Sequence, residues 1–562
     1  MHEIITLQLG QQSNYLATHF WNAQESYFTY SEDQEPAINH DIHWRPGIGA
    51  DGTETYMPRT VIYDLKGGFG SMAKTNALYN DLEEGQTPQA LCVQTHPSLR
   101  LPPDSPPLLS HHRNGPTVLQ KQPVIPQSTY QQSLDAGLEP PPLTTDTVRY
   151  WSDFNRVFYH PRSVVQLNEY ELNSSIMPFE RYATGEDLFA SLDKEHDLLD
   201  RDLRPFIEEA DQMQGIQVMT GLDDAWGGFA AKYLERIRDE YGKTAMFVWG
   251  SEQESAMRVG GLSREKRLPR LANKVRTLTE VYKYASVVVP FTVPATLPGS
   301  VVLDASSQWH NTALSAAAIE SVTLPSRLRD PANRDTMGTL ADTLNAMGKQ
   351  NVASLGMSFA PEPTEEEDVV MEGTQDFRQR QKLLNQKSSR HAAVMAKENP
   401  EGVFLDINFT PTDQLDYVRR RGGGDDDRPR VFSQVLTSRG YEVDEQAQEA
   451  KEAEEDERFR RRSSYETVMR SYHTPLRFPL LDSFPQIFRD DSGEPLKRGG
   501  GINVTSSLST DASVHRRLKS LRTTVGRSIG LEDREQLGNE LAEMADEYHE
   551  GWSSGSDDGD DD

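Results

Sequence analysis

The fold of this chain is decided by residues 3–21, EIITLQLGQQSNYLATHFW. Apolar side chains alternate in the residues before Gly10, which predicts a β-strand. Leu16, Phe20 and Trp21 then recur with helical spacing. A strand, a glycine turn and a helix start form a natural anion site, because the first N–H groups of a helix have no intrahelical partner. The stretch therefore predicts the first unit of a nucleotide-binding α/β fold.

Further strands and helices alternate along the chain. A helix is expected to follow the loop that begins at Gly221, with Phe229, Tyr233, Leu234 and Ile237 on one face. Another is expected behind the Ser/Asp-rich segment 304–307. This alternation predicts an α/β class with a doubly wound, mostly parallel sheet. The additional strand-like segments are 61–63, 212–220, 246–249 and 287–291.

Composition narrows the class of protein. The chain has 562 residues, of which 36% are hydrophobic, so it can bury a large core and form two to three domains. A net charge of −29 argues against a direct nucleic-acid binder, which needs a cationic surface. Cys92 is the only cysteine, which excludes disulfides and thiolate metal clusters and fits a reducing compartment. No metal site is expected.

No transmembrane segment or import signal is expected. The most apolar stretch, residues 285–303, is interrupted by three prolines. No run reaches the roughly 18 apolar residues that a membrane span requires. The first residues lack the Arg-rich, acid-poor pattern of a mitochondrial presequence. Any association with an organelle is therefore expected to be peripheral.

Changes in composition predict the domain boundaries. Residues 1–87 and 149–325 are expected to form the nucleotide-binding-type domain. Residues 88–148 are rich in proline and polar residues and are expected to be a disordered insertion. Residues 326–530 are expected to form a smaller α+β domain, with a charged spacer at about 419–462. A C-terminal helix and an acidic tail follow at 531–562.

Two short motifs resemble tubulins. The motif GQQSN, residues 10–14, is similar to the first nucleotide loop of tubulins. The segment YMPRTVIYDLK, residues 56–66, is similar to the strand by which tubulins deliver an acidic loop to the nucleotide, which makes Asp64 a candidate contact. The other candidate contacts implied by the resemblance are Gly10, Gln11, Gln12 and Asn14.

Longer motifs resemble the Misato family, tubulin-related proteins that include the fungal factor for mitochondrial DNA inheritance. They are RDEYG at 238–242, SQWHNTA at 307–313 and FPLLDSFP at 478–485. The resemblance implies a tubulin/FtsZ-like first domain. It also implies a role in mitochondrial distribution, morphology and genome inheritance, and animal members have a chromosome-segregation or tubulin-assembly role.

The phosphate loop departs from the tubulin pattern. The resemblance aligns the tubulin loop GGGTGSG with LDDAWGG, residues 222–228, and only Gly227 and Gly228 remain. Glycines matter there because residues without a Cβ let backbone N–H groups wrap the phosphates closely. Asp223 and Asp224 add carboxylates, and one like-charge contact near 4 Å costs about 4 kcal/mol at an effective dielectric of 20. That would cancel much of a micromolar affinity, roughly 8 kcal/mol.

Other residues bear on catalysis. Trp226 is expected to be a buried indole that holds the loop shut, and carboxylates that bind Mg²⁺ beside phosphates are the alternative. Tubulin-like polymers also need a hydrolytic loop of the form NxDxxE, and residues 333–338, NRDTMG, end in glycine instead. The sequence therefore predicts no enzyme and no catalytic residue. Asn311 completes the degenerate nucleotide-like set.

The leading hypothesis is a non-catalytic tubulin-like scaffold or adaptor in mitochondrial partitioning and DNA inheritance. It would act at the mitochondrial outer surface and in the cytoplasm, and a protein receptor on the outer membrane is the expected tether. The first alternative is an active GTP-binding switch or polymer subunit with GTP and Mg²⁺ as cofactors. The second alternative is a cofactor of tubulin or of the cytosolic chaperonin.

Overall fold

The computed structural model describes residues 2–29, 36–48, 54–72, 125–253, 264–360, 402–411, 429–440, 467–490, 492–528 and 530–549. The charged run at 445–462, the acidic tail at 556–562 and Cys92 lie outside these residues. Among the described helices, none is long and apolar enough to cross a membrane.

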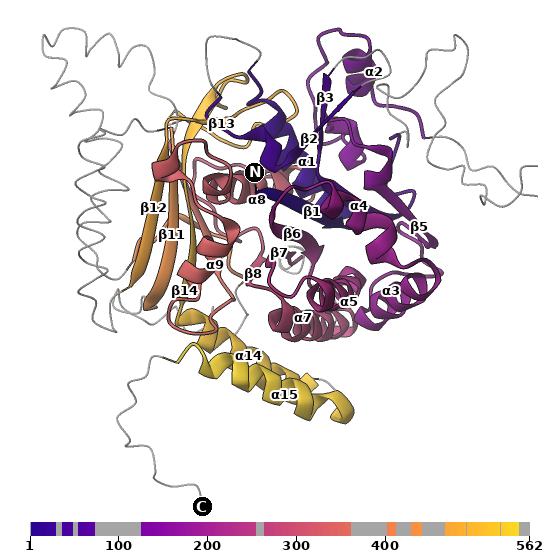
Figure 1. Ribbon diagram of the computed structural model, residues 1–562, viewed down its shortest axis with the longest axis vertical. Helices are drawn as coiled ribbons and strands as arrows, with labels where there is room; N and C mark the ends of the chain where they lie inside the picture. Colours follow the sequence, from indigo (N-terminus) through magenta and orange to yellow (C-terminus); the bar gives the residue numbers. More distant parts are fainter. Residues whose placement is uncertain are drawn as a thin grey trace, which may run out of the picture.

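Six parallel strands form the first sheet, in the order β5-β4-β1-β6-β7-β8 (Figure 1). The chain runs outward from β1 through β4 to β5 and then returns to β6 on the other side of β1. The strand order therefore reverses at β1, and ligands of such sheets bind at the carboxyl ends of the strands beside this reversal. The strands are β1 (Glu3–Leu9), β4 (Thr60–Lys66), β5 (Val164–Glu171), β6 (Met213–Gly221), β7 (Ala245–Ser251) and β8 (Val287–Phe291).

Helices cover both faces of this sheet, which confirms the doubly wound α/β prediction. Successive residues of β7 show the alternation: Met246 and Val248 pack on one side, and Phe247 and Trp249 on the other. The first face packs against α3 (Tyr182–His196), α5 (Ala225–Glu240) and α7 (Arg264–Tyr284). The second face packs against α1 (Gln11–Glu25) and α8 (Gln308–Val322).

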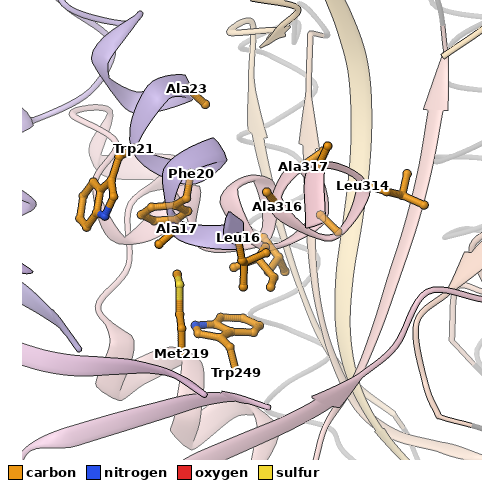
Figure 2. Close-up of a cluster of buried hydrophobic side chains, with 14 of the residues drawn as sticks. Leu16, Ala17, Phe20, Trp21, Ala23, Met219, Trp249, Leu314, Ala316 and Ala317 are labelled. Atoms are coloured by element: carbon orange, nitrogen blue, oxygen red, sulfur yellow. The ribbon is translucent and has the colours of Figure 1, made fainter. Parts of the chain in front are cut away.

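Helix α8 lies at the centre of the molecule. Figure 2 shows Phe20 and Leu16 of α1 beside Ala316 and Ala317 of α8. The small alanine side chains let the two helices approach closely. Leu314 points away from α1, toward the strands of a second sheet. Because both sides of α8 are covered, every residue from Thr312 to Val322 is buried, polar and apolar alike.

The second sheet is mixed and has the order β10-β9-β14-β11-β12, with β13 paired to β14. Only the β11–β12 pair is parallel among these pairings. Helix α9 (Met337–Leu344) packs against it, and α14 (Ser513–Ser528) and α15 (Leu531–Asp546) form a pair below it (Figure 1). This confirms the smaller α+β C-terminal region. The strands are β9 (Ser354–Ala360), β10 (Ile407–Asn408), β11 (Val431–Arg439), β12 (Val468–Thr474), β13 (Phe478–Pro479) and β14 (Gly501–Asp511).

The spacer predicted at about 419–462 is wrong in its middle part. Residues 431–439, VFSQVLTSR, form β11, which is buried along its whole length between β12 and β14. Several of its buried polar side chains form hydrogen bonds within the fold; for example, Ser433 Oγ donates to the Leu344 carbonyl at 2.8 Å. The strand resembles a polar linker in sequence because its flanks are highly charged.

The disordered insertion predicted at 88–148 is also wrong for its last part, residues 125–148. Helix α2 (Thr129–Asp135) packs there through Tyr130, which is buried and donates a hydrogen bond to Asp482 at 3.1 Å. Leu143 is buried as well. These two apolar anchors order a segment whose composition is otherwise typical of disorder. Residues 88–124 lie outside the described residues.

Three smaller features were not predicted. Residues 44–58 form a hairpin of β2 (Trp44–Ile48) and β3 (Glu54–Pro58). Helix α14 pairs with α15, so the boundary expected at residue 530 falls inside a helical hairpin. The remaining short helical segments are η1 (His40–Ile42), η2 (Trp151–Phe154), η3 (Pro161–Ser163), η4 (Leu199–Leu203), α4 (Arg204–Glu208), η5 (Leu324–Ser326) and η6 (Pro331–Asn333).

Candidate functional site

The turn at Gly10 lies where the strand order reverses, between β1 and α1. Gly10 has a φ of 85°, a conformation that residues with a Cβ rarely adopt. Its N–H donates to the Tyr63 carbonyl of β4 at 3.0 Å, and α1 begins at the next residue. The structure thus builds the predicted glycine turn and helix start at the carboxyl end of β1.

Gln11, Asn14 and Asp64 are brought together beside this turn. The Gln11 side-chain amide donates to the Asp64 carboxylate and to the Gly68 carbonyl, both at 2.6 Å. The Asn14 amide donates to the same carboxylate oxygen at 2.7 Å. A Cβ on Gly68 would lie 2.3 Å from Asp64 Oδ1, so a glycine is required for this close approach. Both N–H hydrogens of the Gln11 amide are therefore used inside the protein.

Burial dominates the chemistry of Asp64. The side chain is fully buried, and this burial raises its pKa from 3.8 to about 7, although the hydrogen bonds from Asn14, Leu65 and Gln11 act in the opposite direction. These donors are neutral, so they stabilise the carboxylate less than a cation would. An anion approaching Gln11 would meet this carboxylate rather than a free amide.

Asp64→Asn is expected to change how stability depends on pH. Because the pKa of Asp64 is raised from 3.8 to about 7 in the fold, the folded chain binds a proton that the unfolded chain releases between these values. Its contribution to stability is complete below 3.8 and is lost as the pH rises toward 7. We measure the urea midpoints of the variant and the parent at several pH values between about pH 5 and about pH 8. The midpoint of the variant minus that of the parent should therefore increase as the pH rises.

The matched control is Asp342→Asn, which changes an exposed carboxyl group on α9. Its midpoint relative to the parent should lack this trend. Equal pH profiles for the two variants would mean that Asp64 is not buried as described.

Trp226 covers the Gly10 turn. Its indole Nε1 lies 2.3 Å from the position that a Cβ on Gly10 would occupy. Only 6% of Trp226 is exposed, and its ring packs edge-on against Phe179 with centroids 5.1 Å apart. The predicted buried indole is thus found against the glycine turn, in the space where backbone N–H groups would face a phosphate.

Asp223 and Asp224 have separate structural roles. Asp224 caps α5, because its Oδ1 accepts a hydrogen bond from the Trp226 N–H at 2.9 Å. Burial raises the pKa of Asp224 to about 7, and the neighbouring Asp223 carboxylate adds to the shift. Asp223 is also buried, lies 3.9 Å from an Arg270 guanidinium nitrogen and accepts from the Gln253 N–H at 3.3 Å. Among the described residues, neither carboxylate belongs to a group of three or more side chains that could hold a metal ion.

Gly227 and Gly228 lie inside α5 rather than in an open loop. Both allow the helix to pack closely against its neighbours. A Cβ on Gly227 would lie 2.1 Å from Thr277 Oγ1 of α7, and one on Gly228 would lie 2.0 Å from the Tyr182 carbonyl oxygen of α3. The helix starts at residue 225, too early for these glycines to form a loop.

Gln12 and Asn311 line a pocket at the carboxyl ends of β7 and β8. Its volume is about 210 Å³, below the roughly 300 Å³ at which ordinary ligand pockets begin. Asn311 donates to the Ala305 carbonyl at 2.9 Å. Glu252, which the sequence analysis missed, also lines the pocket and pairs with Lys274 at 2.7 Å. The pocket therefore contains a carboxylate where a phosphate site would need positive charge.

Residues 333–338 serve to attach β12. Asn333 accepts a hydrogen bond from the His473 N–H at 2.7 Å. Asp335 accepts from Arg470 at 2.5 Å and from the Tyr472 hydroxyl at 2.7 Å. Both polar side chains that resemble a hydrolytic loop are thus used in contacts with the second sheet.

The parallel sheet, the glycine turn at its reversal point and the central helix α8 define a tubulin-like protein. Two family models match the chain: a Misato Segment II tubulin-like domain over residues 2–136 and a Tubulin domain over residues 140–328. The chain belongs to the DML1/Misato family, as the resemblance in its motifs predicted.

Fungal relatives match the whole chain, and an animal relative matches part of it. Protein dml-1 of Neurospora crassa is 93% identical over 562 residues, with 100% of each chain covered. Protein DML1 of Gibberella zeae is 43% identical over 565 residues, again with 100% of each chain covered. Protein misato homolog 1 of Bos taurus is 31% identical over 375 residues, which cover 63% of this chain and 64% of that protein.

Proposed function

We propose that this protein is a non-catalytic tubulin-like scaffold that acts in the partitioning of mitochondria and the inheritance of mitochondrial DNA. One observation carries the non-catalytic part: the indole of Trp226 fills the space against the Gly10 turn. Two further features support it. The Gln11 amide already donates to the Asp64 carboxylate, so it is not free to bind a phosphate, and the pocket beside Gln12 contains the Glu252 carboxylate, which would repel one. The mitochondrial part rests on family membership and the role that the family resemblance implies.

The purified protein is expected not to bind GTP. Titration with labelled GTP and Mg²⁺ should show no saturable binding up to about 100 μM, since loss of the phosphate contacts removes most of the roughly 8 kcal/mol of a micromolar site. Purified tubulin serves as the positive control. Micromolar binding that is abolished by Gln11→Ala would overturn the scaffold proposal.

A complementation experiment tests the mitochondrial role. In a fungal strain depleted of the protein, the mitochondrial DNA content per cell should fall, and the Gln11→Ala variant should restore it as well as the parent chain does. Normal mitochondrial DNA content after depletion would refute the role in inheritance. Failure of Gln11→Ala alone, with the protein present at the parent level, would refute the nucleotide-independent mechanism.

An active GTP-binding switch is the second candidate. The pocket between Gln12 and Asn311 favours it, because it lies at the ligand-binding edge of a doubly wound sheet. Saturable GTP binding in the titration would support this candidate.

We also propose a protein partner at the outer mitochondrial membrane, with tubulin and the cytosolic chaperonin as further possible partners. Crosslinking in isolated mitochondria followed by purification of the protein tests the first, and copurification from cytosol tests the others. If the protein purified from mitochondria carried lipid but was crosslinked to no other protein, a protein receptor would be contradicted.

A further inference from the structure

Helix α14 carries a basic face in an acidic protein. One side of the helix is buried against the rest of the fold, and the opposite side is exposed and cationic. Between residues 512 and 530 there is no acidic residue, although the whole chain has a net charge of −29. The buried side chains are Val514, Leu518, Leu521 and Val525, and the exposed cations, here called the α14 basic face, are Arg516, Lys519, Arg522 and Arg527.

Two acidic residues of the neighbouring helix α15 pair with α7 and not with Lys519, Arg522 or Arg527. Asp533 of α15 pairs with Arg276 of α7. Glu540 Oε1 of α15 lies 3.2 Å from Lys283 Nζ, which also belongs to α7. These acids of α15 are therefore directed toward α7. Within the described residues, Lys519, Arg522 and Arg527 form no side-chain ion pair or hydrogen bond.

The C-terminal end of α15 lies beside the start of α14. The His515 ring nitrogen Nδ1 lies 2.7 Å from the Ala545 carbonyl oxygen, and the rings of His515 and His549 are 5.3 Å apart. The chain continues from this point with EGWSSGSDDGDDD, residues 550–562, which contain Glu550 and five aspartates. Thirteen extended residues span up to about 43 Å, and a 16-residue helix is about 24 Å long. The acidic segment can thus reach every cation of the basic face.

We propose that residues 550–562 bind the α14 basic face of the same chain and shield it from other anionic partners. The attraction is electrostatic: cationic side chains on one helix face meet the carboxylates of a segment attached at the end of that face. Such a contact is screened by salt and needs no fixed conformation of the segment. The segment then controls how strongly the basic face attracts external acidic peptides.

Attachment makes even a weak contact effective. A short flexible link gives an effective concentration of about 1 mM. If the free peptide binds with a Kd of about 30 μM, the attached segment occupies the face in roughly 97% of molecules and weakens binding of an external peptide about 30-fold.

A peptide titration tests this proposal. The probe is a fluorescent peptide of sequence 550–562, added to two full-length chains: the parent and a chain with neutral aspartate positions (D557N, D558N, D560N, D561N and D562N). Fluorescence anisotropy should show binding to the neutral chain that is at least about ten-fold tighter than binding to the parent. Raising the salt from about 0.05 M to about 0.3 M should weaken it several-fold.

The control variants locate the contact. In the neutral chain, Lys519→Glu with Arg522→Glu should abolish peptide binding, and Arg334→Glu, which changes an exposed arginine before α9, should preserve it. Equal affinities for the parent and neutral chains would overturn the proposal, as would binding that survives the double charge reversal. Tail-dependent dimers in sedimentation would overturn the intramolecular form. Binding of anionic vesicles to the neutral chain without any binding of the peptide would show a lipid site instead.

Discussion

Glu320→Gln is expected to lower the free energy of unfolding by about 3 to 5 kcal/mol, the usual cost of breaking a buried ion pair by removing one partner. Glu320 lies in α8 and is fully buried, as are Arg327 and Arg439 on either side of its carboxylate. Arg327 donates to Glu320 Oε1 at 2.5 Å, and Arg439 donates to the other oxygen. Removal of the charge leaves two buried guanidinium groups without their shared anion.

The same cluster joins three parts of the chain. Arg439 ends β11 and also donates to the Tyr27 hydroxyl at 2.8 Å, just beyond α1. Burial alone would raise the pKa of Glu320, but the two arginines hold it below its ordinary value of 4.5. The stabilising contribution of Glu320 is therefore complete above about pH 4.5 and is lost as the pH falls through the lowered pKa.

Urea unfolding followed by tryptophan fluorescence measures the effect. The control is Glu280→Gln, which removes the Lys283–Glu280 pair at 2.8 Å on the partly exposed side of α7. That change should cost at most about 0.5 kcal/mol, as for other surface pairs. If Glu320→Gln were equally mild, the cluster would not hold the two sheets together.

Gly228→Ala is expected to cost about 3 kcal/mol, at the upper end for overpacking of a closely packed contact. The added Cβ would lie 2.0 Å from the Tyr182 carbonyl oxygen, which belongs to the backbone of α3 and cannot rotate away. A Cβ added to Gly185 of α3 would likewise lie 1.7 Å from the Ala225 carbonyl oxygen of α5. Helices α3 and α5 therefore approach each other closely at a glycine on each helix.

The matched control is Gly242→Ala, where the nearest atom to the new Cβ lies 3.7 Å away. It should change stability by less than about 0.5 kcal/mol in the same urea experiment. The comparison also separates two interpretations of Gly228. If Gly228 serves packing, its substitution lowers the stability of the protein. If it belonged to a phosphate loop, its substitution would leave the stability unchanged and lower only the affinity for the ligand.

Local patterns predicted the first sheet well. Apolar side chains recur with a regular period in three of its elements, so the order of residues alone reveals them. These elements are the strand before Gly10, the strand ending near Asp64 and the helix containing Phe229. Strand β11 was missed because several of its buried side chains are polar. Arg439 in particular can be buried only because Glu320, 119 residues away in sequence, supplies a carboxylate.

The candidate site was predictable in part for the same reason. Gln11, Asn14 and Asp64 belong to short motifs, and they do meet in space. The role of Gly228 depends on its distance from Tyr182 of α3, which no local pattern encodes. The size of the pocket beside Gln12 likewise depends on how α8 packs, because α8 contributes several of its walls.

The central position of α8 has a consequence during synthesis. One continuous apolar core contains residues from Ile4 to Leu508, and the Trp309 indole N–H donates to the Ser483 carbonyl at 3.1 Å. A nascent chain that has reached only the end of α8 therefore exposes the apolar face of that helix to the ribosome surface and to the solvent. We expect the amino-terminal half to stay aggregation-prone until translation is almost finished, because its missing wall is made last.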